Sequence, residues 1–198
     1  MSILLAGFGD LTVLQREFEE SFPDFPELFV QPVLLLKAFE YEKLRRRYAF
    51  IGRPLLSSRE DVLFLANILR EKYRDATLFV GHGTEHSADR FYAELAEILP
   101  ENAFVGTLTG ALNFEIVKRR IMSGGVKELS VVPLTLGTGK HVQKEILGDW
   151  SNNLEESGIT VSRVNLGLLD YAEVRRKFIS NAASDIDNIA RSHTFAPN

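Results

Sequence analysis

Apolar residues along this chain fall into two alternating patterns, short continuous runs typical of buried strands and stripes at helical spacing. Leu14, Phe18 and Phe22 form one such stripe, which ends at Pro23. The expected strands cover residues 3–6, 28–36, 48–56, 77–80, 103–108, 129–136 and 160–166. The expected helices cover residues 11–22, 39–47, 58–69, 87–99, 113–124, 140–158 and 171–191, followed by a frayed tail from His193. This alternation predicts an α/β fold with parallel sheets flanked by helices.

The two halves of the chain resemble each other. Residues 4–9 match residues 78–83, and residues 28–32 match residues 129–133. The two segments of the second pair lie farther apart along the chain than those of the first pair. The difference is about the length of the strand–helix unit around residues 103–124. We therefore expect two similar lobes, a shortened one in residues 1–70 and a longer one in residues 71–198, with the last helix free to pack on the first lobe.

Composition narrows the class of protein. The chain has 198 residues, 45% of them hydrophobic, which is enough to fill a core. A formal net charge of −4 gives no basic footprint for nucleic acid. No apolar run is long enough to cross a membrane, and no signal peptide precedes the first strand. Because cysteine is absent, any metal must be held by histidine and carboxylate. These features predict a cytoplasmic protein that binds neither nucleic acid nor membrane.

Candidate chemistry gathers at the ends of two expected strands. His82 follows one strand in a Gly-His-Gly turn, Glu85 and His86 come soon after it, and His141 follows a later strand and a glycine-rich loop. The carboxyl ends of parallel strands share one edge, so these side chains are expected to converge on one crevice. Imidazole suits divalent cobalt, nickel, iron or zinc, and neutral imidazole also accepts protons near pH 7.

Other interpretations of the same stretch compete with a metal site. Residues 81–84 could cradle a phosphate, but the Gly-x-Gly-x-x-Gly spacing and a P-loop lysine are absent, so no nucleotide is expected. A hydrolase could use Ser87 or Thr84 with His82, although nothing places an orienting acid. Arg90 and Lys140 could pair with substrate carboxylates or be ordinary solvated charges.

Five blocks in order resemble the anaerobic-type sirohydrochlorin cobalt chelatases of cobalamin synthesis, a class that inserts metal without ATP. They are residues 52–56, 81–86, 104–107, 132–134 and 139–150. The resemblance implies a two-lobed chelatase-like fold with a cleft for a flat tetrapyrrole that carries many carboxylates. It places His82 and His141 at the two catalytic positions, which bind the incoming metal and take protons from the pyrrole nitrogens. Glu85 and His86 are further candidate ligands.

Three residues depart from the family pattern. Thr109 stands where the family has a metal-binding glutamate, Leu34 where it often has a histidine, and Lys140 where an acid usually precedes the second histidine. We expect these changes to weaken metal affinity, with Glu85 or Glu115 as the substitute carboxylate. The expected substrate-binding residues are Gly9, Asp10, Thr84, Arg90, Thr109, Thr138 and Lys140.

The expected function is insertion of a divalent ion into sirohydrochlorin or a related tetrapyrrole. The ion is expected to be Co²⁺, with Ni²⁺ or Fe²⁺ as alternatives, and to be the substrate, so no further cofactor is needed. The rival hypothesis is a relative that binds a tetrapyrrole or metal as a carrier or sensor without inserting the ion. A shortened lobe could also expose apolar surface that a second copy covers, which would make the protein a homo-oligomer.

Overall fold

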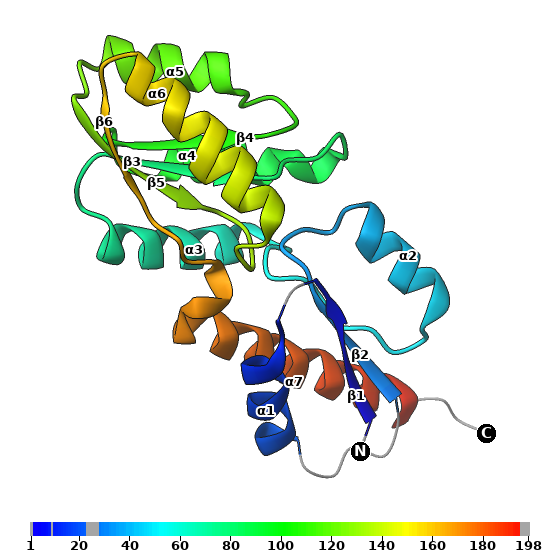
Figure 1. Ribbon diagram of the computed structural model, residues 1–198. Helices are drawn as coiled ribbons and strands as arrows, with labels where there is room; N and C mark the ends of the chain where they lie inside the picture. Colours follow the sequence, from blue (N-terminus) through cyan, green and yellow to red (C-terminus); the bar gives the residue numbers. More distant parts are fainter. Residues whose placement is uncertain (1, 9, 23–27, 195–198) are drawn as a thin grey trace. The chain divides into compact units, whose positions relative to one another are not determined.

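The computed structural model describes residues 2–8, 10–22 and 28–194. The chain forms two compact units, Met1–Ser57 with Tyr171–Asn198 and Ser58–Asp170. Each unit is α/β, with a parallel sheet and flanking helices (Figure 1). The boundary follows Ser57 rather than falling near residue 70, and the last helix belongs to the first unit.

The first unit contains a small parallel sheet. Its elements are β1 (Ser2–Gly7), α1 (Thr12–Ser21), β2 (Leu28–Val33), α2 (Phe39–Arg47) and α7 (Ala172–Thr194). β1 and β2 pair in parallel along their whole length. The strand expected over residues 48–56 is reduced to single bridges from Ile51 to Val30 and from Leu56 to Leu36. The ladder breaks between them because Pro54 has no N–H and the Arg53 N–H bonds a side chain, Asp185 Oδ2, at 2.8 Å.

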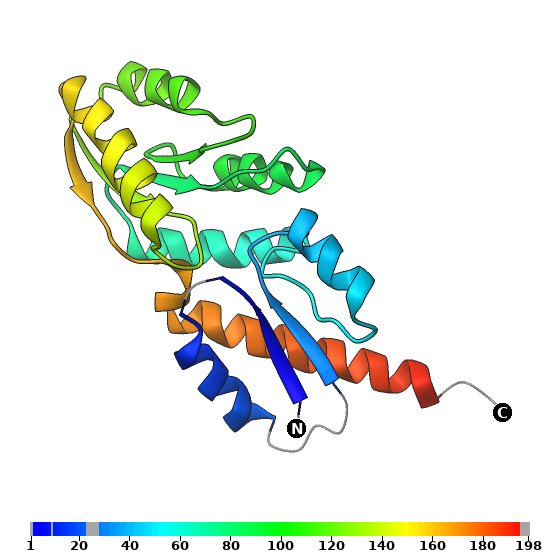
Figure 2. The same ribbon diagram turned by 45° about the vertical axis from the view of Figure 1, so that its right-hand side comes forward.

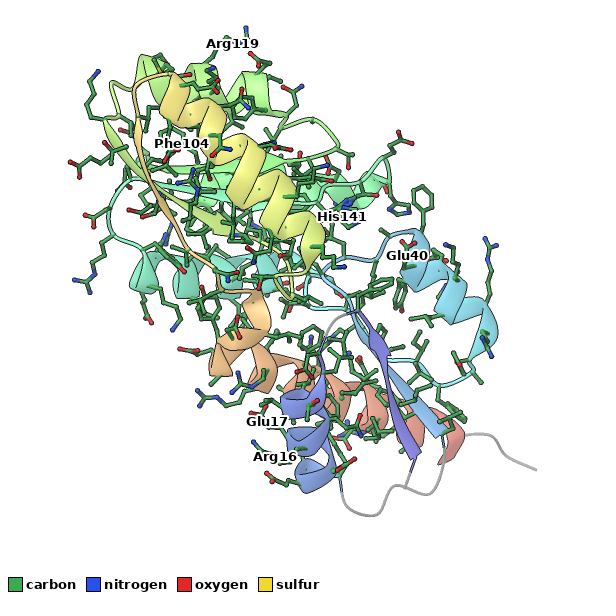
Figure 3. All side chains as sticks on the ribbon, viewed as in Figure 1. Arg16, Glu17, Glu40, Phe104, Arg119 and His141 are labelled. Carbon is green, nitrogen blue, oxygen red and sulfur yellow. The ribbon has the colours of Figure 1, made fainter. Side chains whose placement is uncertain are left out.

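The long helix α7 packs on β2 and α1. Phe18, Phe29 and Phe178, from these three elements, are fully buried. Beside them Arg175 Nε donates to Glu17 Oε1 at 2.9 Å, where Glu17 on α1 is labelled in Figure 3. The helix runs to Thr194, so His193 lies within it and the tail expected to fray from His193 was placed too early.

The second unit carries the larger sheet, with strand order β4-β3-β5-β6 and all neighbours parallel. Its strands are β3 (Thr77–Gly81), β4 (Ala103–Thr107), β5 (Glu128–Pro133) and β6 (Thr160–Arg163). Its helices and helical turns are α3 (Arg59–Lys72), η1 (Ser87–Asp89), α4 (Arg90–Ile98), α5 (Phe114–Ser123), η2 (Val142–Trp150), α6 (Ser151–Glu156) and η3 (Leu168–Asp170).

Helices cover both faces of this sheet, with α5 and α6 on one side and α3 and α4 on the other (Figures 1 and 2). Leu78 and Val80 of β3 face the first pair of helices, in a core that includes Ile121 and Trp150. On the opposite face, Phe79 meets Tyr73 at the end of α3, with ring centroids 5.5 Å apart. The alternation of strand side chains between two helical layers explains why these strands are apolar along their whole length.

Helix ends follow the sequence where a polar side chain caps them. Ser58 and Asp61 form a capping box at the start of α3, and Asn113 Oδ1 accepts the Ile116 N–H at 3.2 Å at the start of α5. Two helices differ from the expectation: the one expected from Ser87 begins as the 3₁₀ turn η1, and the one after His141 begins as the π-helical segment η2. No helix among the described residues is long and apolar enough to span a lipid bilayer.

The internal repeat is visible in the order of the strands. β1 pairs with β2, and β2 is bridged to Ile51, just as β3 pairs with β5 and β5 with β6. The described residues of the first unit contain no counterpart of β4. The missing piece is therefore one strand–helix unit beside β1, as the sequence comparison indicated.

Candidate metal-binding and active site

His82 is the first residue after β3, and its side chain is exposed at the carboxyl end of the sheet. Its Nδ1 lies 3.2 Å from the carbonyl oxygen of Gly83. A neutral ring with its proton on Nδ1 can donate to that oxygen, which leaves the lone pair of Nε2 for a metal ion or a proton.

The main chain at His82 is anchored by the next strand. The carbonyl oxygen of His82 accepts the Thr109 N–H at 2.9 Å and the Thr109 hydroxyl at 3.0 Å. Gly83 adopts φ +74°, and a Cβ built on it would lie 1.6 Å from the carbonyl oxygen of Thr109. Only glycine permits this close approach of the two loops. Thr109 therefore fixes the backbone that presents His82.

A second link between these loops comes from Asp89, which sequence analysis did not single out. Its Oδ1 accepts the Thr84 N–H at 3.1 Å, and its Oδ2 accepts the Ala111 N–H at 3.2 Å. The loop after β3 and the loop after β4 are thus joined by one half-buried carboxylate. Gly110, at φ +107°, leaves room for it, because a Cβ there would lie 2.5 Å from Asp89 Oδ2.

Replacing Asp89 by alanine is expected to lower the free energy of unfolding by about 2 kcal/mol, because two backbone N–H groups lose a charged acceptor. Asp89→Asn keeps a single acceptor oxygen, so its free energy of unfolding should lie between those of the wild type and Asp89→Ala. Urea denaturation of each variant measures the change. Asp149→Ala, which removes an exposed carboxylate, is the control and should leave stability unchanged. Equal stability of Asp89→Ala and wild type would show that the carboxylate does not hold the loops.

His86, a predicted ligand, is used differently. Its Nδ1 accepts the Ala88 N–H at 3.1 Å and so caps the turn η1. In a neutral ring the proton then sits on Nε2, and no lone pair is left for a metal ion. The neighbouring predicted ligand Glu85 is exposed.

His141 lies just before η2, with 87% of its side chain exposed (Figure 3). Its Nδ1 lies 3.2 Å from Glu145 Oε1, one helical turn further along. A carboxylate at this position holds the proton on Nδ1 and leaves the lone pair of Nε2 for a metal ion, as second-sphere carboxylates do in metal sites. Sequence analysis missed Glu145, although its spacing of four residues from His141 on an expected helix was a usable signal.

Both histidines follow strands of one sheet on the same side. β3 and β5 are parallel neighbours, with Val80 opposite Pro133, and His82 and His141 come after their carboxyl ends. Within residues 2–8, 10–22 and 28–194, however, no three His, Asp or Glu side chains form a group that could hold a metal ion. The structure thus offers two exposed imidazoles at one edge, and among the described residues they form no such group with Glu145 or any other carboxylate.

The remaining predicted residues have local partners or face solvent. Asp10 Oδ1 accepts the Thr12 hydroxyl at 2.6 Å and the Thr12 N–H at 2.9 Å, and these bonds hold the pKa of Asp10 below its usual value. Arg90 lies over the ring of Phe91 and within 3.9 Å of Glu94. Thr138 is half-buried, and Lys140 and Glu115 are exposed. Gly9 lies outside the described residues.

Comparison with known proteins decides the family. The profile of the cobalt chelatase (CbiK) family matches residues 12–187, which is most of the chain. The chain belongs to the cobalt chelatase family.

Individual members are distant relatives. The protein is 28% identical over 174 residues to a sirohydrochlorin cobaltochelatase of Nitratidesulfovibrio vulgaris, covering 76% of this chain and 62% of that relative. It is 25% identical over 192 residues to the sirohydrochlorin cobaltochelatase of Salmonella typhimurium, covering 86% of this chain and 72% of that one. The chain thus spans less than two thirds of the length of the first of these relatives.

This member of the cobalt chelatase family shares its fold with solved structures. SirB from Bacillus subtilis with Fe³⁺ superposes with a TM-score of 0.58 at 16% identity, covering 93% of this chain and 94% of that one. A sirohydrochlorin chelatase SirB from Bacillus subtilis subspecies spizizenii, in complex with cobalt, gives the same TM-score and identity over 94% and 95%. The chelatase-like α/β fold expected from the sequence is confirmed.

The departures from the family pattern have structural explanations in two cases. Thr109 hydrogen-bonds the carbonyl of His82 with both its N–H and its hydroxyl, so the side chain at this position anchors a loop. Leu34 is 9% exposed and packs as a core residue of the first unit. Lys140 faces solvent, and nothing in the structure explains why a cation stands before His141.

Proposed function

We propose that this protein inserts a divalent metal ion, cobalt in the first place, into sirohydrochlorin or a closely related tetrapyrrole. Family membership supports the reaction class. One observation carries the site: His82 and His141 stand exposed at one edge of the sheet, each with Nδ1 3.2 Å from an acceptor oxygen, which leaves the Nε2 lone pair of a neutral ring for an ion. The metal ion is a substrate of this reaction rather than a resident cofactor.

The chemistry requires groups that hold a cation and then accept protons. Insertion of M²⁺ into a free-base tetrapyrrole forms metal–nitrogen bonds and releases the two protons of the pyrrole N–H groups, so charge is balanced. Neutral imidazole can perform both tasks, because Nε2 binds the ion before insertion and accepts a proton after the ion has left. Two such rings match the two protons. With only two protein ligands, water and the tetrapyrrole nitrogens would complete the coordination of the ion.

The wild-type protein itself tests this proposal. Mixing it with sirohydrochlorin and Co²⁺ should convert the absorption spectrum of the free tetrapyrrole to that of the metal complex, faster than in buffer. Ni²⁺ and Fe²⁺ in parallel reactions give the metal preference. A rate equal to the uncatalysed rate with all three ions would reject the chelatase proposal.

A second candidate function is a carrier or sensor that binds the tetrapyrrole or the ion without joining them. The observation that favours it is that, among the described residues, His82, His141 and the neighbouring carboxylates form no group of three side chains that could hold a metal ion. In addition, the Thr109 hydroxyl donates a hydrogen bond to the carbonyl oxygen of His82. Saturable binding of sirohydrochlorin, measured by fluorescence quenching, with no spectral conversion would favour this function over insertion.

Glu145 is expected to act through His141. Replacing Glu145 by alanine should lower kcat/KM for cobalt insertion by about tenfold to a hundredfold, because His141 loses the partner that fixes its tautomer. Glu145→Gln, which keeps an acceptor oxygen but loses the charge, should retain more activity than Glu145→Ala. Glu115→Ala is the matched control, since Glu115 is an exposed helical carboxylate that was expected to replace the missing ligand. Loss of activity in Glu115→Ala with full activity in Glu145→Ala would reverse this assignment.

A further inference from the structure

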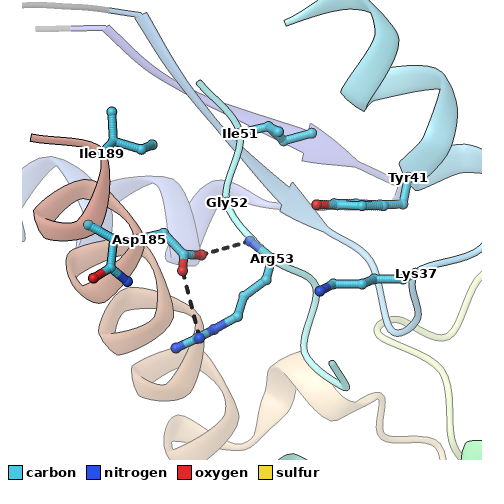
Figure 4. Close-up of a pocket in the computed structure, with 8 residues that line it drawn as sticks. Lys37, Tyr41, Ile51, Gly52, Arg53, Asp185 and Ile189 are labelled. Carbon is cyan, nitrogen blue, oxygen red and sulfur yellow. Dashed lines mark hydrogen bonds and ion pairs between the residues drawn. The ribbon is translucent and has the colours of Figure 1, made fainter. Parts of the chain in front are cut away.

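A cavity of about 310 Å³ lies within the first unit, apart from the residues assigned to metal insertion (Figure 4). It is formed by the loop before α2, by α2, by the segment bridged to β2 and by α7. Its lining residues are Lys37, Tyr41, Ile51, Gly52, Arg53, Asp185, Asn188 and Ile189. Its volume is at the lower end of the range for small-molecule sites.

The floor of the cavity is held in place by hydrogen bonds. The Gly52 N–H donates to Val30 O at 2.9 Å, and the side-chain amide of the fully buried Gln31 donates to Arg53 O at 2.9 Å. A Cβ at position 52 would lie 2.5 Å from Gln31 Oε1 and 2.9 Å from Phe29 Cζ, so a larger residue there would displace these buried side chains. The segment that carries Arg53 is therefore fixed before any ligand arrives, which reduces the entropic cost of binding.

The cavity has an excess of positive charge. Lys37 and Arg53 are opposed only by Asp185, one of whose oxygens already accepts the Arg53 N–H at 2.8 Å. The guanidinium of Arg53 lies 3.7 Å from the other oxygen, a loose ion pair, and its Nε has no hydrogen-bond acceptor among the described residues. Lys37 Nζ lies 5.9 Å from the ring of Tyr41 and makes no ion pair in the described part of the chain.

Two donors point into this space from the α2 side, and the Arg53 guanidinium lies on the side of Asp185. Figure 4 shows the Lys37 ammonium and the Tyr41 hydroxyl both pointing from the α2 side toward Gly52 and Arg53. Burial, the largest cause, and the nearby charges of Asp185 and Glu42 raise the pKa of Tyr41, so its hydroxyl keeps its proton and remains a donor at neutral pH. Ile51 and Ile189 supply apolar wall. The lining thus combines cationic donors with a short apolar surface.

We propose that this cavity binds a carboxylate on a short apolar stem, with the carboxylate between Lys37 and Arg53 and the stem against Ile51 and Ile189. One negative charge neutralises the excess of one positive charge that Lys37, Arg53 and Asp185 leave together. Charge-assisted hydrogen bonds from an ammonium and a guanidinium are the strong contacts for this group. This inference does not depend on the proposed metal insertion.

The test uses sodium propionate as the probe and propionamide as its neutral isostere, each titrated into the full-length protein at constant ionic strength. Backbone amide NMR signals of Gly52 and Arg53 should shift and saturate with propionate, and should not saturate with propionamide. Lys37→Met should weaken propionate binding by about tenfold, the loss expected for one hydrogen bond to a charged group. Lys43→Met is the matched control, because Lys43 on α2 is exposed and pairs with Glu40.

Each possible result of these titrations either supports or overturns the proposed carboxylate site. Saturable propionate binding that Lys37→Met weakens and Lys43→Met does not would support the site. Equal binding of propionamide, no saturation, or equal effects of the two lysine variants would overturn it, provided that circular dichroism shows both variants folded. If Lys37→Met also weakens sirohydrochlorin binding tenfold, the carboxylate is an arm of the tetrapyrrole; if tetrapyrrole binding is unchanged, the site takes a separate small acid. The insertion assay reports on the histidine site independently.

Discussion

Cobalt insertion is expected to fall by at least about a hundredfold when either His82 or His141 is replaced by alanine, because a positioned base contributes about that much. Each variant also loses one of the two exposed imidazoles that follow β3 and β5. Initial rates of spectral conversion of sirohydrochlorin, measured over a range of Co²⁺ concentrations, separate the two effects. Loss of metal binding raises the KM for Co²⁺, and loss of a proton acceptor lowers kcat.

His86→Ala provides the control for these substitutions. His86 lies close to His82 in sequence, but its Nδ1 is engaged with the Ala88 N–H. Its loss should cost about 1 kcal/mol of stability, as for other helix-capping side chains, and leave insertion largely intact. If His86→Ala abolished insertion and His82→Ala did not, the roles assigned to the two rings would be exchanged.

The fold was predictable wherever one local pattern determined an element. The apolar strands were expected and are present, and α3 and α5 begin where expected, at the capping residues Ser58 and Asn113. The strand expected over residues 48–56 was wrong for a tertiary reason: Asp185, distant in the chain, takes the N–H of Arg53. A hydrogen bond between residues so far apart in the chain leaves no pattern in the sequence around either of them. The π-helical opening of η2 was likewise invisible, since its apolar spacing resembles that of an α-helix.

The candidate site was predictable in part. The glycine-flanked His82 and the later His141 follow neighbouring strands, and the rule for parallel sheets is enough to place both at one edge. Asp89 could not be found in this way, because its partners are backbone N–H groups, one of them 22 residues away. Thr109 was expected to weaken the metal site by lacking a charge and to contact the substrate. The structure gives it a second role, since its hydroxyl holds the carbonyl of His82.

Gly83→Ala is expected to lower the free energy of unfolding by about 3 kcal/mol, which combines the cost of a left-handed alanine with a steric clash. The clash is severe because the new Cβ would lie 1.6 Å from the carbonyl oxygen of Thr109, a backbone atom that cannot rotate away. The loops must then separate, which breaks the Thr109 bonds to His82 and displaces the imidazole. Urea denaturation and the cobalt insertion assay should therefore both report a loss.

Gly139→Ala is the control for this substitution. It tests whether alanine is tolerated at another glycine in the loops that carry His82 and His141. Gly139 precedes His141, its φ is not positive, and a Cβ there would meet nothing within 4 Å. This variant should keep both stability and insertion activity. If Gly83→Ala were as stable and active as Gly139→Ala, the close contact with Thr109 would not be needed to present His82. A stable but inactive Gly83→Ala variant would instead show that the loop can relax, and that the position of the imidazole, rather than the integrity of the fold, depends on this glycine.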